Sequence, residues 1–460
     1  MTVQLTKSAP SAAIAITVVD RAAFKELAPK LPAATRNWLA AVGFDGKPDS
    51  HALIPDAEGK LGQVFAGVER AASPWALAAL PQTLPQGAYQ LSDAGLQVPA
   101  EQAALSWELG AYQFDVYKPR RRPAATLQLL SSPEAQRGLA MAHVIAATRD
   151  LVNTPAEHMG PDELAQAAKH VAKQHGAKFS AIVGEDLLKK NFPAIHAVGR
   201  ASTRAPRLIE LNWGSSKHPK LTIVGKGVCF DTGGLDMKSA DGMRQMKKDM
   251  GGAANALGLA SLVMALKLPV NLQLLIPAVE NSVAGNAYRP GDVIKTRQGL
   301  QIEIGNTDAE GRVILCDALA YASESKPELI IDLATLTGAA RIALGAQLPA
   351  LFAKHMDTAR DLVDLGLKLD DPLWHMPLWA PYKEGIASSI GDIVNTGRNA
   401  LGGAINAALF LEYFVPEYQD WLHVDLFAWN DVARAGRPVG GEAQTIRTLL
   451  AYLEERFSPT

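Results

Sequence analysis

The stretch Asn306-Thr307-Asp308-Ala309-Glu310-Gly311-Arg312 constrains this chain more than any other. Residues 300–304 before it alternate apolar and polar side chains at the period of a strand, and residues 313–321 after it have the length and apolar spacing of a buried helix. The two acids and the arginine therefore lie on a predicted strand-to-helix loop, where ligand sites of α/β sheets usually form. Two acids this close repel each other when both are ionised, unless a cation stands between them. Taken alone, this stretch has a simpler alternative interpretation, in which Asp308 and Glu310 stand at a helix N-terminus and complement the helix dipole.

A second set of acids lies upstream. A β-branched strand at 221–224 ends at a glycine and is followed by Lys226, Asp231 and Lys238. Asp249 directly precedes the small residues that open a helix predicted to continue to about residue 266. Four acids thus stand at strand ends or helix starts of what reads as one sheet: Asp231, Asp249, Asp308 and Glu310. If they converge, they need about four positive charges to coexist, which two divalent ions supply.

Composition limits the class of protein. The chain has 460 residues, 48% of them hydrophobic, and a formal net charge of −2, which indicates a globular protein large enough for two domains. This balance shows no attraction to nucleic acid or to acidic membranes. Cys229 and Cys316 both fall in apolar stretches and are interpreted as buried thiols of a reducing compartment. The apolar run at 12–19 lacks a convincing cleavage site, and no run approaches the ~20 residues that span a bilayer. We therefore predict a cytoplasmic protein.

The pattern of elements predicts an α/β fold in two parts. Residues 1–124 form a small N-terminal α/β domain that ends near the basic cluster 118–123, and this domain includes a helix predicted at 61–72. Residues 125–460 form a larger α/β domain, with residues 132–152 as the connecting helix. Strands predicted at 196–198, 208–211, 221–224, 272–279, 329–333 and 422–426 alternate with helical segments. This alternation indicates a central, mostly parallel or mixed sheet covered on both faces.

Three blocks of sequence resemble the leucyl aminopeptidase family, the two-metal cytosol aminopeptidases. They read VGKGVCFDTGG, MKKDMGGAA and NTDAEGR, in the family's order. The intervals also fit: five residues from Lys226 to Asp231, seven from there to Lys238, and fifty-nine from Asp249 to Asp308. The similarity runs from about residue 150 to 414, and it makes the larger domain the catalytic one.

The resemblance implies a set of metal ligands. Asp231 and Glu310 would bridge two metals, Asp249 and Lys226 would complete one site, and Asp308 would complete the other. An amine ligand must be neutral, so Lys226 would need a strongly lowered pKa. Carboxylates and one amine suit Mn²⁺, Zn²⁺ or Mg²⁺.

The resemblance also implies a reaction. Two metals about 3.5–4 Å apart share a water, lower its pKa and hold it as hydroxide beside a polarised carbonyl. A free substrate amine that coordinates one metal would confine cleavage to the first peptide bond. Lys238 resembles the family lysine that stabilises the developing oxyanion. Arg312 resembles the arginine that holds a bicarbonate ion, the general base.

Further residues resemble the family's substrate-binding positions. The expected set for the first-residue pocket and the substrate backbone is Met246, Asn306, Thr335, Leu336 and Gly338. Departures from the family pattern lie at 239–240, 423–428 and 440–443. They bear on the side-chain preference and leave the reaction untouched.

The predicted function is a metal-dependent aminopeptidase that releases N-terminal amino acids from peptides, with a leucine-like preference. The resemblance implies a homohexamer acting on peptide substrates, and the composition and run lengths predict no membrane partner and make a nucleic-acid partner unlikely. A DNA-binding regulatory protein on a peptidase scaffold, a catalytically inactive scaffold subunit and another two-metal hydrolase, such as a phosphoesterase, are the alternatives. The net charge near zero speaks against the first of them.

Overall fold

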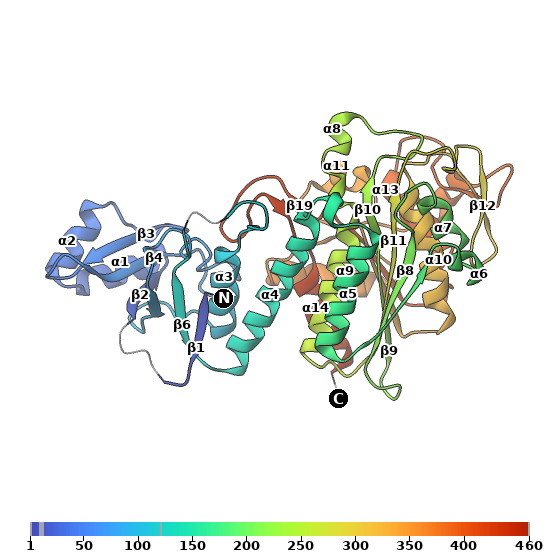
Figure 1. Cartoon of the computed structure of the whole chain (residues 1–460). Helices are drawn as coiled ribbons and strands as arrows, with labels where there is room; N and C mark the ends of the chain where they lie inside the picture. Colours follow the sequence, from blue (N-terminus) through green and yellow to red (C-terminus); the bar gives the residue numbers. More distant parts are fainter. Residues whose placement is uncertain (1, 9–12, 120–121, 459–460) are drawn as a thin grey trace. The chain divides into compact units, whose positions relative to one another are not determined.

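The computed structural model describes residues 2–8, 13–119 and 122–458 (Figure 1). Arg120 and Arg121, in the basic cluster of the sequence, lie outside the described residues. The chain divides into two compact units, one of residues 1–146 with 432–439 and one of residues 147–431 with 440–460. The helix α4 (Pro133–Asn153) forms where the connecting helix was expected. The division predicted at residue 124 stays a prediction.

The first unit is built on a six-stranded sheet in the order β1-β6-β5-β2-β4-β3. All neighbouring strands pair in parallel except β3 and β4, which are antiparallel. The predicted helix at 61–72 is wrong, because its first part is β4, paired on one side with β2 and on the other with β3. The strands are β1 (Val3–Thr6), β2 (Ile14–Val19), β3 (His51–Pro55), β4 (Leu61–Gly67), β5 (Ala88–Leu91) and β6 (Thr126–Leu130), and the helices are α1 (Arg21–Leu27), α2 (Ala33–Ala41) and α3 (Ala100–Ala111).

The short segment 432–439 belongs to this first unit, although the chain on both sides of it belongs to the second. The guanidinium carbon of Arg437 lies 3.9 Å from the centre of the Trp75 ring. A Cβ at Gly436 would lie 3.0 Å from the same ring. The segment therefore packs on a side chain that is remote from it in sequence.

The second unit is built on a nine-stranded mixed sheet. Its main path runs β16-β15-β18-β14-β9-β11-β8-β7, and β10 adds to β11. The inner strands β18, β14, β9 and β11 are parallel, whereas β15, β8 and β7 introduce antiparallel pairs. The strands are β7 (Lys178–Val183), β8 (Arg207–Trp213), β9 (Lys220–Gly225), β10 (Gly227–Asp231), β11 (Asn271–Asn281), β14 (Leu329–Ala334), β15 (Ala350–Ala353), β16 (Trp374–His375) and β18 (Trp421–Asp425). The predicted class, a small α/β part before a larger one with a mixed central sheet, is confirmed.

Helices cover this sheet in two layers (Figure 1). In one layer α9 packs against α5 and α14, and in the other α10 packs against α7 and α13. The helix α9 is apolar on all sides and buried from Gly251 to Met264, as expected of a helix inside a large core. The main helices are α5 (Pro161–His175), α7 (Pro193–Gly199), α9 (Gly251–Ala265), α10 (Glu310–Glu324), α11 (Gly338–Leu344), α12 (Met356–Lys368), α13 (Gly403–Glu412) and α14 (Ile446–Phe457).

The strand predicted at 196–198 is wrong, because this stretch lies in α7. Pro193 stands in the first turn of that helix. The carboxylate of Asp317 accepts hydrogen bonds from the backbone N–H groups of Ala194 and Ile195 at 2.8 and 3.3 Å. The side chain of Asp317, in α10, therefore accepts from the backbone N–H groups at the start of α7, which have no partner within that helix.

Short elements complete the second unit. A small sheet in the order β12-β13-β17 lies beside the main one, and β19 pairs with β20. These elements are β12 (Val293–Lys295), β13 (Gln301–Glu303), β17 (Ile393–Val394), β19 (Trp429–Asn430), β20 (Gly440–Gly441), α6 (Asp186–Lys189), α8 (Ala240–Met243) and the 3-10 helices η2 (Ala156–His158), η3 (Met246–Met250) and η4 (Ala380–Ile386). The remaining 3-10 helix, η1 (Ala28–Lys30), belongs to the first unit. Among the described residues, none of the helices combines the length and the hydropathy that a bilayer crossing requires.

Candidate metal and peptide site

The ends of the inner parallel strands bring the predicted site residues to one edge of the sheet. Lys226 follows the last residue of β9, and Asp231 is the last residue of β10. Thr335 follows β14, which lies between β9 and β18. Because parallel strands present their carboxyl ends at the same edge, segments far apart in the sequence meet there. Asp249, in η3, and Glu310, the first residue of α10, reach this edge from helix starts.

Three carboxylates form a compact group at this edge. Asp231, Asp308 and Glu310 each offer one oxygen, and these oxygens lie within 4.8 Å of one another. Asp231 and Glu310 are buried, and Asp308 is partly exposed. Burial and the neighbouring Asp231 carboxylate raise the pKa of Asp308 to about 6, although Lys238 opposes this rise. Burial and Asp231 likewise raise the pKa of Glu310 well above its ordinary value.

Two lysines lie between the carboxylates. The ammonium of Lys226 lies 2.8 Å from Asp249 Oδ2 and 3.0 Å from Glu310 Oε1, and it donates to the backbone carbonyl of Thr335 at 2.7 Å. The ammonium of Lys238 lies 2.8 Å from Asp231 Oδ2 and pairs with Asp308 Oδ1. The site therefore holds four carboxylates and two ammonium groups. Its excess of negative charge is the condition under which a buried acid cluster binds cations.

The donor set fits divalent metal ions. Asp249 Oδ2, Asp308 Oδ1 and Glu310 Oε1 are buried, and each touches a lysine ammonium without accepting a hydrogen bond of good geometry from any described residue. Burial lowers the pKa of Lys226, but Asp249, Glu310 and Asp231 outweigh burial and raise the pKa above its ordinary value. Lys226 would therefore become a neutral amine ligand only when further positive charge offsets these carboxylates, which divalent cations would supply.

Glycines allow the close approach of the ligands. A Cβ at Gly311 would lie 2.6 Å from Cε of Lys226 and 2.8 Å from its Nζ, so any side chain at this position would displace the lysine. Gly233 has a φ of +88°, and a Cβ there would lie 3.0 Å from Asp308 Oδ1. A glycine in each of these two signature blocks therefore makes room for a charged group of the other block.

Polar neighbours hold the acids in place. Asn281, the last residue of β11, donates from its side chain to Asp231 Oδ1 at 2.8 Å, as does the backbone of Gly233. The hydroxyl of Thr335 donates to Asp249 Oδ1 at 2.8 Å. Groups that orient ligands in this way tune the affinity for the metal.

Replacing Thr335 by valine removes the donor to Asp249 and keeps the volume of the side chain. We expect the affinity for the activating metal to fall about tenfold to a hundredfold, because the carboxylate loses its orientation. The metal concentration that gives half-maximal activity measures this change. Thr83→Val, on an exposed residue of the first unit, serves as the control, and an unchanged metal dependence of Thr335→Val would contradict the expectation.

Arg312 lies in the first turn of α10, beside the acids but outside their ion pairs. It is buried, and its Nε has no hydrogen-bond partner among the described residues. Burial lowers the pKa of Arg312 to about 10, although Glu310 and Asp425 oppose this. A buried guanidinium without a bound carboxylate is suited to holding a small anion.

The residues expected to bind substrate lie around the same edge. Met246 is partly buried in η3, and Gly338 begins α11. The backbone N–H of Leu336 donates to Asp425 Oδ1 at 3.0 Å. The side-chain oxygen of Asn306 accepts a hydrogen bond from the backbone N–H of Asp308 at 2.7 Å. This oxygen therefore helps to fix the loop that carries Asp308.

The motif reasoning missed several residues that the fold places at the site. Asp425 ends β18 and accepts hydrogen bonds from Leu336, from the backbone of Thr337 and from the Thr337 hydroxyl, so it holds the loop after β14. Asn281 was missed as well. Both stand where an apolar strand ends in a polar residue, and this signal, applied to every strand, would have found them. Lys248 was also missed. Burial lowers the pKa of Lys248 to about 8; the charges of Lys226 and Arg341 lower this pKa further, whereas the carboxylate of Asp249 raises it.

Comparison with known proteins identifies the architecture. Residues 146–450 match the catalytic domain of the cytosol aminopeptidase family, and residues 14–130 match the M17 aminopeptidase N-terminal domain. The chain belongs to the cytosol aminopeptidase family. It is accordingly a metal-dependent aminopeptidase, a metallo-exopeptidase that hydrolyses peptide bonds, and the predicted resemblance is confirmed. The comparisons give no support to the DNA-binding alternative or to another class of two-metal hydrolase.

Matches to relatives within this family cover between 81% and 99% of this chain. A probable cytosol aminopeptidase of Syntrophotalea carbinolica is 39% identical over 396 residues, which cover 81% of this chain and 79% of the relative. The crystal structure of cytosol aminopeptidase from Coxiella burnetii is 48% identical, with a TM-score of 0.94 and 99% of each chain covered. The bottromycin maturation enzyme BotP in complex with Mn is 31% identical, with a TM-score of 0.87, and the match covers 97% of this chain and 100% of that one.

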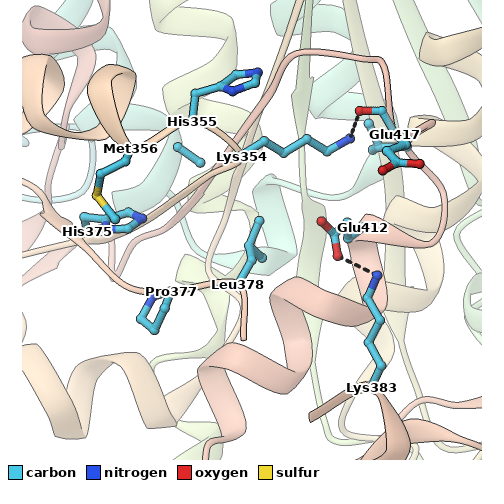
Figure 2. Close-up of a pocket in the computed structure, with 11 residues that line it drawn as sticks. Lys354, His355, Met356, His375, Pro377, Leu378, Lys383, Glu412 and Glu417 are labelled. Carbon is cyan, nitrogen blue, oxygen red and sulfur yellow. Dashed lines mark hydrogen bonds and ion pairs between the residues drawn. The ribbon is translucent and has the colours of Figure 1, made fainter. Parts of the chain in front are cut away.

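A separate cavity of about 750 Å³ lies in the same unit (Figure 2). None of the predicted site residues lines it. Lys383 points to Glu412, with 2.8 Å between the charged atoms, and Lys354 donates to the backbone carbonyls of Pro416 and Glu417 at 2.7 and 3.2 Å. Because both lysines are already paired, the cavity does not indicate which ligand would bind there.

Proposed function

We propose that this aminopeptidase binds two divalent metal ions with Lys226, Asp231, Asp249, Asp308 and Glu310. The observation that carries the proposal is the convergence of four carboxylates and two lysines at one edge of the sheet. When bound, such ions would lower the pKa of a water molecule and polarise the carbonyl of the scissile bond. In this proposal Asp231 and Glu310 would serve both ions, Asp249 and Lys226 would hold one ion, and Asp308 would hold the other.

The catalytic roles go to Lys238 and Arg312. Lys238 keeps its proton, because the carboxylates of Asp231 and Asp308 outweigh burial and raise its pKa. Its ammonium can therefore donate to the oxygen on which negative charge develops. Arg312 would hold a bicarbonate ion, which would supply the general base, since the Arg312 Nε has no partner among the described residues. Met246, Asn306, Thr335, Leu336 and Gly338 would hold the first residue and the backbone of the peptide.

The chemistry of the ligands is compatible with Mn²⁺, Zn²⁺ or Mg²⁺. The manganese complex of the bottromycin maturation enzyme, at 31% identity, supports manganese. We further propose a cytoplasmic location, in line with the name of the relatives as cytosol aminopeptidases. A leucine-like preference is proposed from the family resemblance and from the structural likeness to a tomato leucine aminopeptidase, and a homohexameric assembly from the family resemblance alone.

Hydrolysis of L-leucine p-nitroanilide with added manganese or zinc, before and after chelation, tests the proposed function. We expect chelation to abolish the activity and renewed metal to restore it. Without the positive charge of the ions, the carboxylates can neither lower the pKa of a water molecule nor polarise the substrate carbonyl. The metal content of the protein, measured by elemental analysis, should approach two ions per chain, as the two-site ligand set implies. Activity that survives complete removal of metal would overturn the proposal.

A further inference from the structure

Two cations meet over one aromatic ring beside the predicted first-residue pocket. Lys248 lies in η3, Arg341 in α11, and Phe427 follows the end of β18. The Nζ of Lys248 is 4.5 Å from the centre of the Phe427 ring, and the guanidinium carbon of Arg341 is 4.9 Å from it. Three segments that are far apart in the sequence therefore bring two positive charges to within 4.9 Å of one ring centre.

Neither cation forms an ion pair with an acid among the described residues. Among the described residues, no carboxylate lies within ion-pair distance of Lys248 or Arg341, and neither side chain makes a hydrogen bond there. Lys248 is only 5% exposed, whereas Arg341 is exposed. Lysines this deeply buried are almost always paired, and a cation over an aromatic face offsets only part of the cost of burial. The cluster of Lys248, Arg341 and Phe427 therefore has the electrostatics of an anion site.

The cluster is continuous with the predicted pocket. Lys248 lies in the same short helix as Met246, and Arg341 lies one turn after Gly338 in α11. A Cβ at Gly251 would lie 2.3 Å from the Cβ of Ala428 and 3.1 Å from Thr335. The residue after Phe427 therefore packs closely against the first residue of α9, which follows Asp249 by two positions. The cluster therefore adjoins the residues that are expected to bind the first residue of the peptide.

We propose that Lys248, Arg341 and Phe427 form a subsite for acidic side chains in the first-residue pocket. The enzyme then removes N-terminal glutamate or aspartate faster than the neutral isosteres glutamine and asparagine. The ring packs against the methylene groups of the substrate side chain, and the two cations bind its carboxylate with charge-assisted hydrogen bonds. This inference rests on the proposed function, because it assumes that the first residue binds beside Met246 and Thr335.

The test compares L-glutamyl, L-glutaminyl and L-leucyl p-nitroanilide as substrates of the metal-loaded protein. These substrates carry no C-terminal carboxylate, so a difference between the first two reports only the charge of the first side chain. We expect kcat/KM for the glutamyl substrate to exceed that for the glutaminyl substrate by about tenfold or more, the usual size of one hydrogen bond to a charged group. Both Lys248→Met and Arg341→Met should lower this ratio several-fold. Hydrolysis of the leucyl substrate should change much less.

Lys368→Met, on an exposed residue of α12, is the matched control and should leave the ratio unchanged. Because Lys248 adjoins Asp249, the leucyl substrate monitors the metal site in each variant, and Arg341→Met tests the subsite from a position outside the ligands. A glutamyl-to-glutaminyl ratio near one in the wild type, or a ratio that neither variant changes, would overturn the subsite. Failure to hydrolyse even the leucyl substrate with metal present would instead overturn the proposed function, and the subsite with it.

Discussion

Replacing Glu310 by glutamine should lower kcat/KM on L-leucine p-nitroanilide by about a thousandfold or more, with a parallel loss of bound metal. The side chain keeps its size, but the buried group loses the charge that it offers to both proposed metal ions and to Lys226, 3.0 Å away. The remaining acids cannot replace Glu310, because each of them already has a different position in the site: Asp249 beside Lys226, and Asp231 and Asp308 beside Lys238. Elemental analysis of the purified variant and steady-state kinetics at saturating metal together measure both losses.

Glu324→Gln, at the other end of the same helix, is the matched control for this experiment. Glu324 pairs with Arg297 at the protein surface, 2.6 Å away, and takes no part in the site. Its substitution should leave turnover and metal content as they are. Full activity in Glu310→Gln, with normal metal content, would remove the central ligand from the proposal.

Replacing Lys238 by methionine should lower kcat by about a hundredfold to a thousandfold, the usual size for one lost oxyanion donor. The value of KM should change little, because the charge on the substrate oxygen develops only in the transition state. Bound metal should persist, since the substitution removes a cation that competes for Asp231 and Asp308. Kinetics and metal analysis therefore separate this variant from Glu310→Gln.

The control for this second experiment is Lys295→Met, on an exposed residue of β12. It removes a lysine of the same unit without touching the site. If Lys238→Met raised KM and left kcat unchanged, the lysine would bind ground-state substrate, and its proposed role would be wrong.

Parts of the charged core could be predicted because their spacing is local. Lys238 lies in the loop that follows Asp231, and Glu310 and Arg312 lie within one helix turn, so a short motif carries the geometry of each pair. The strand ends were also visible as apolar runs that stop at polar residues. Long-range contacts were not visible: Asp317 caps α7 from 123 residues away in the chain, and without that contact the alanine-rich stretch at 194–199 fits more than one structure.

The same limit explains the missed residues. Lys248 stands beside a predicted ligand, but its burial against Phe427 depends on where β18 ends, which no local pattern reports. The helix predicted at 61–72 failed for a related reason. Two partner strands stabilise β4 more than the intrinsic helix propensity of its alanine and leucine residues could stabilise a helix.

Because of the segment 432–439, one cut in the chain cannot divide it into the two units. Since this stretch belongs to the first unit, the polypeptide passes between the units at three points along its length. A fragment started at Ala147 would carry a loop whose packing partner, Trp75, had been cut away. Expression of the catalytic part by itself therefore requires that this loop be shortened as well.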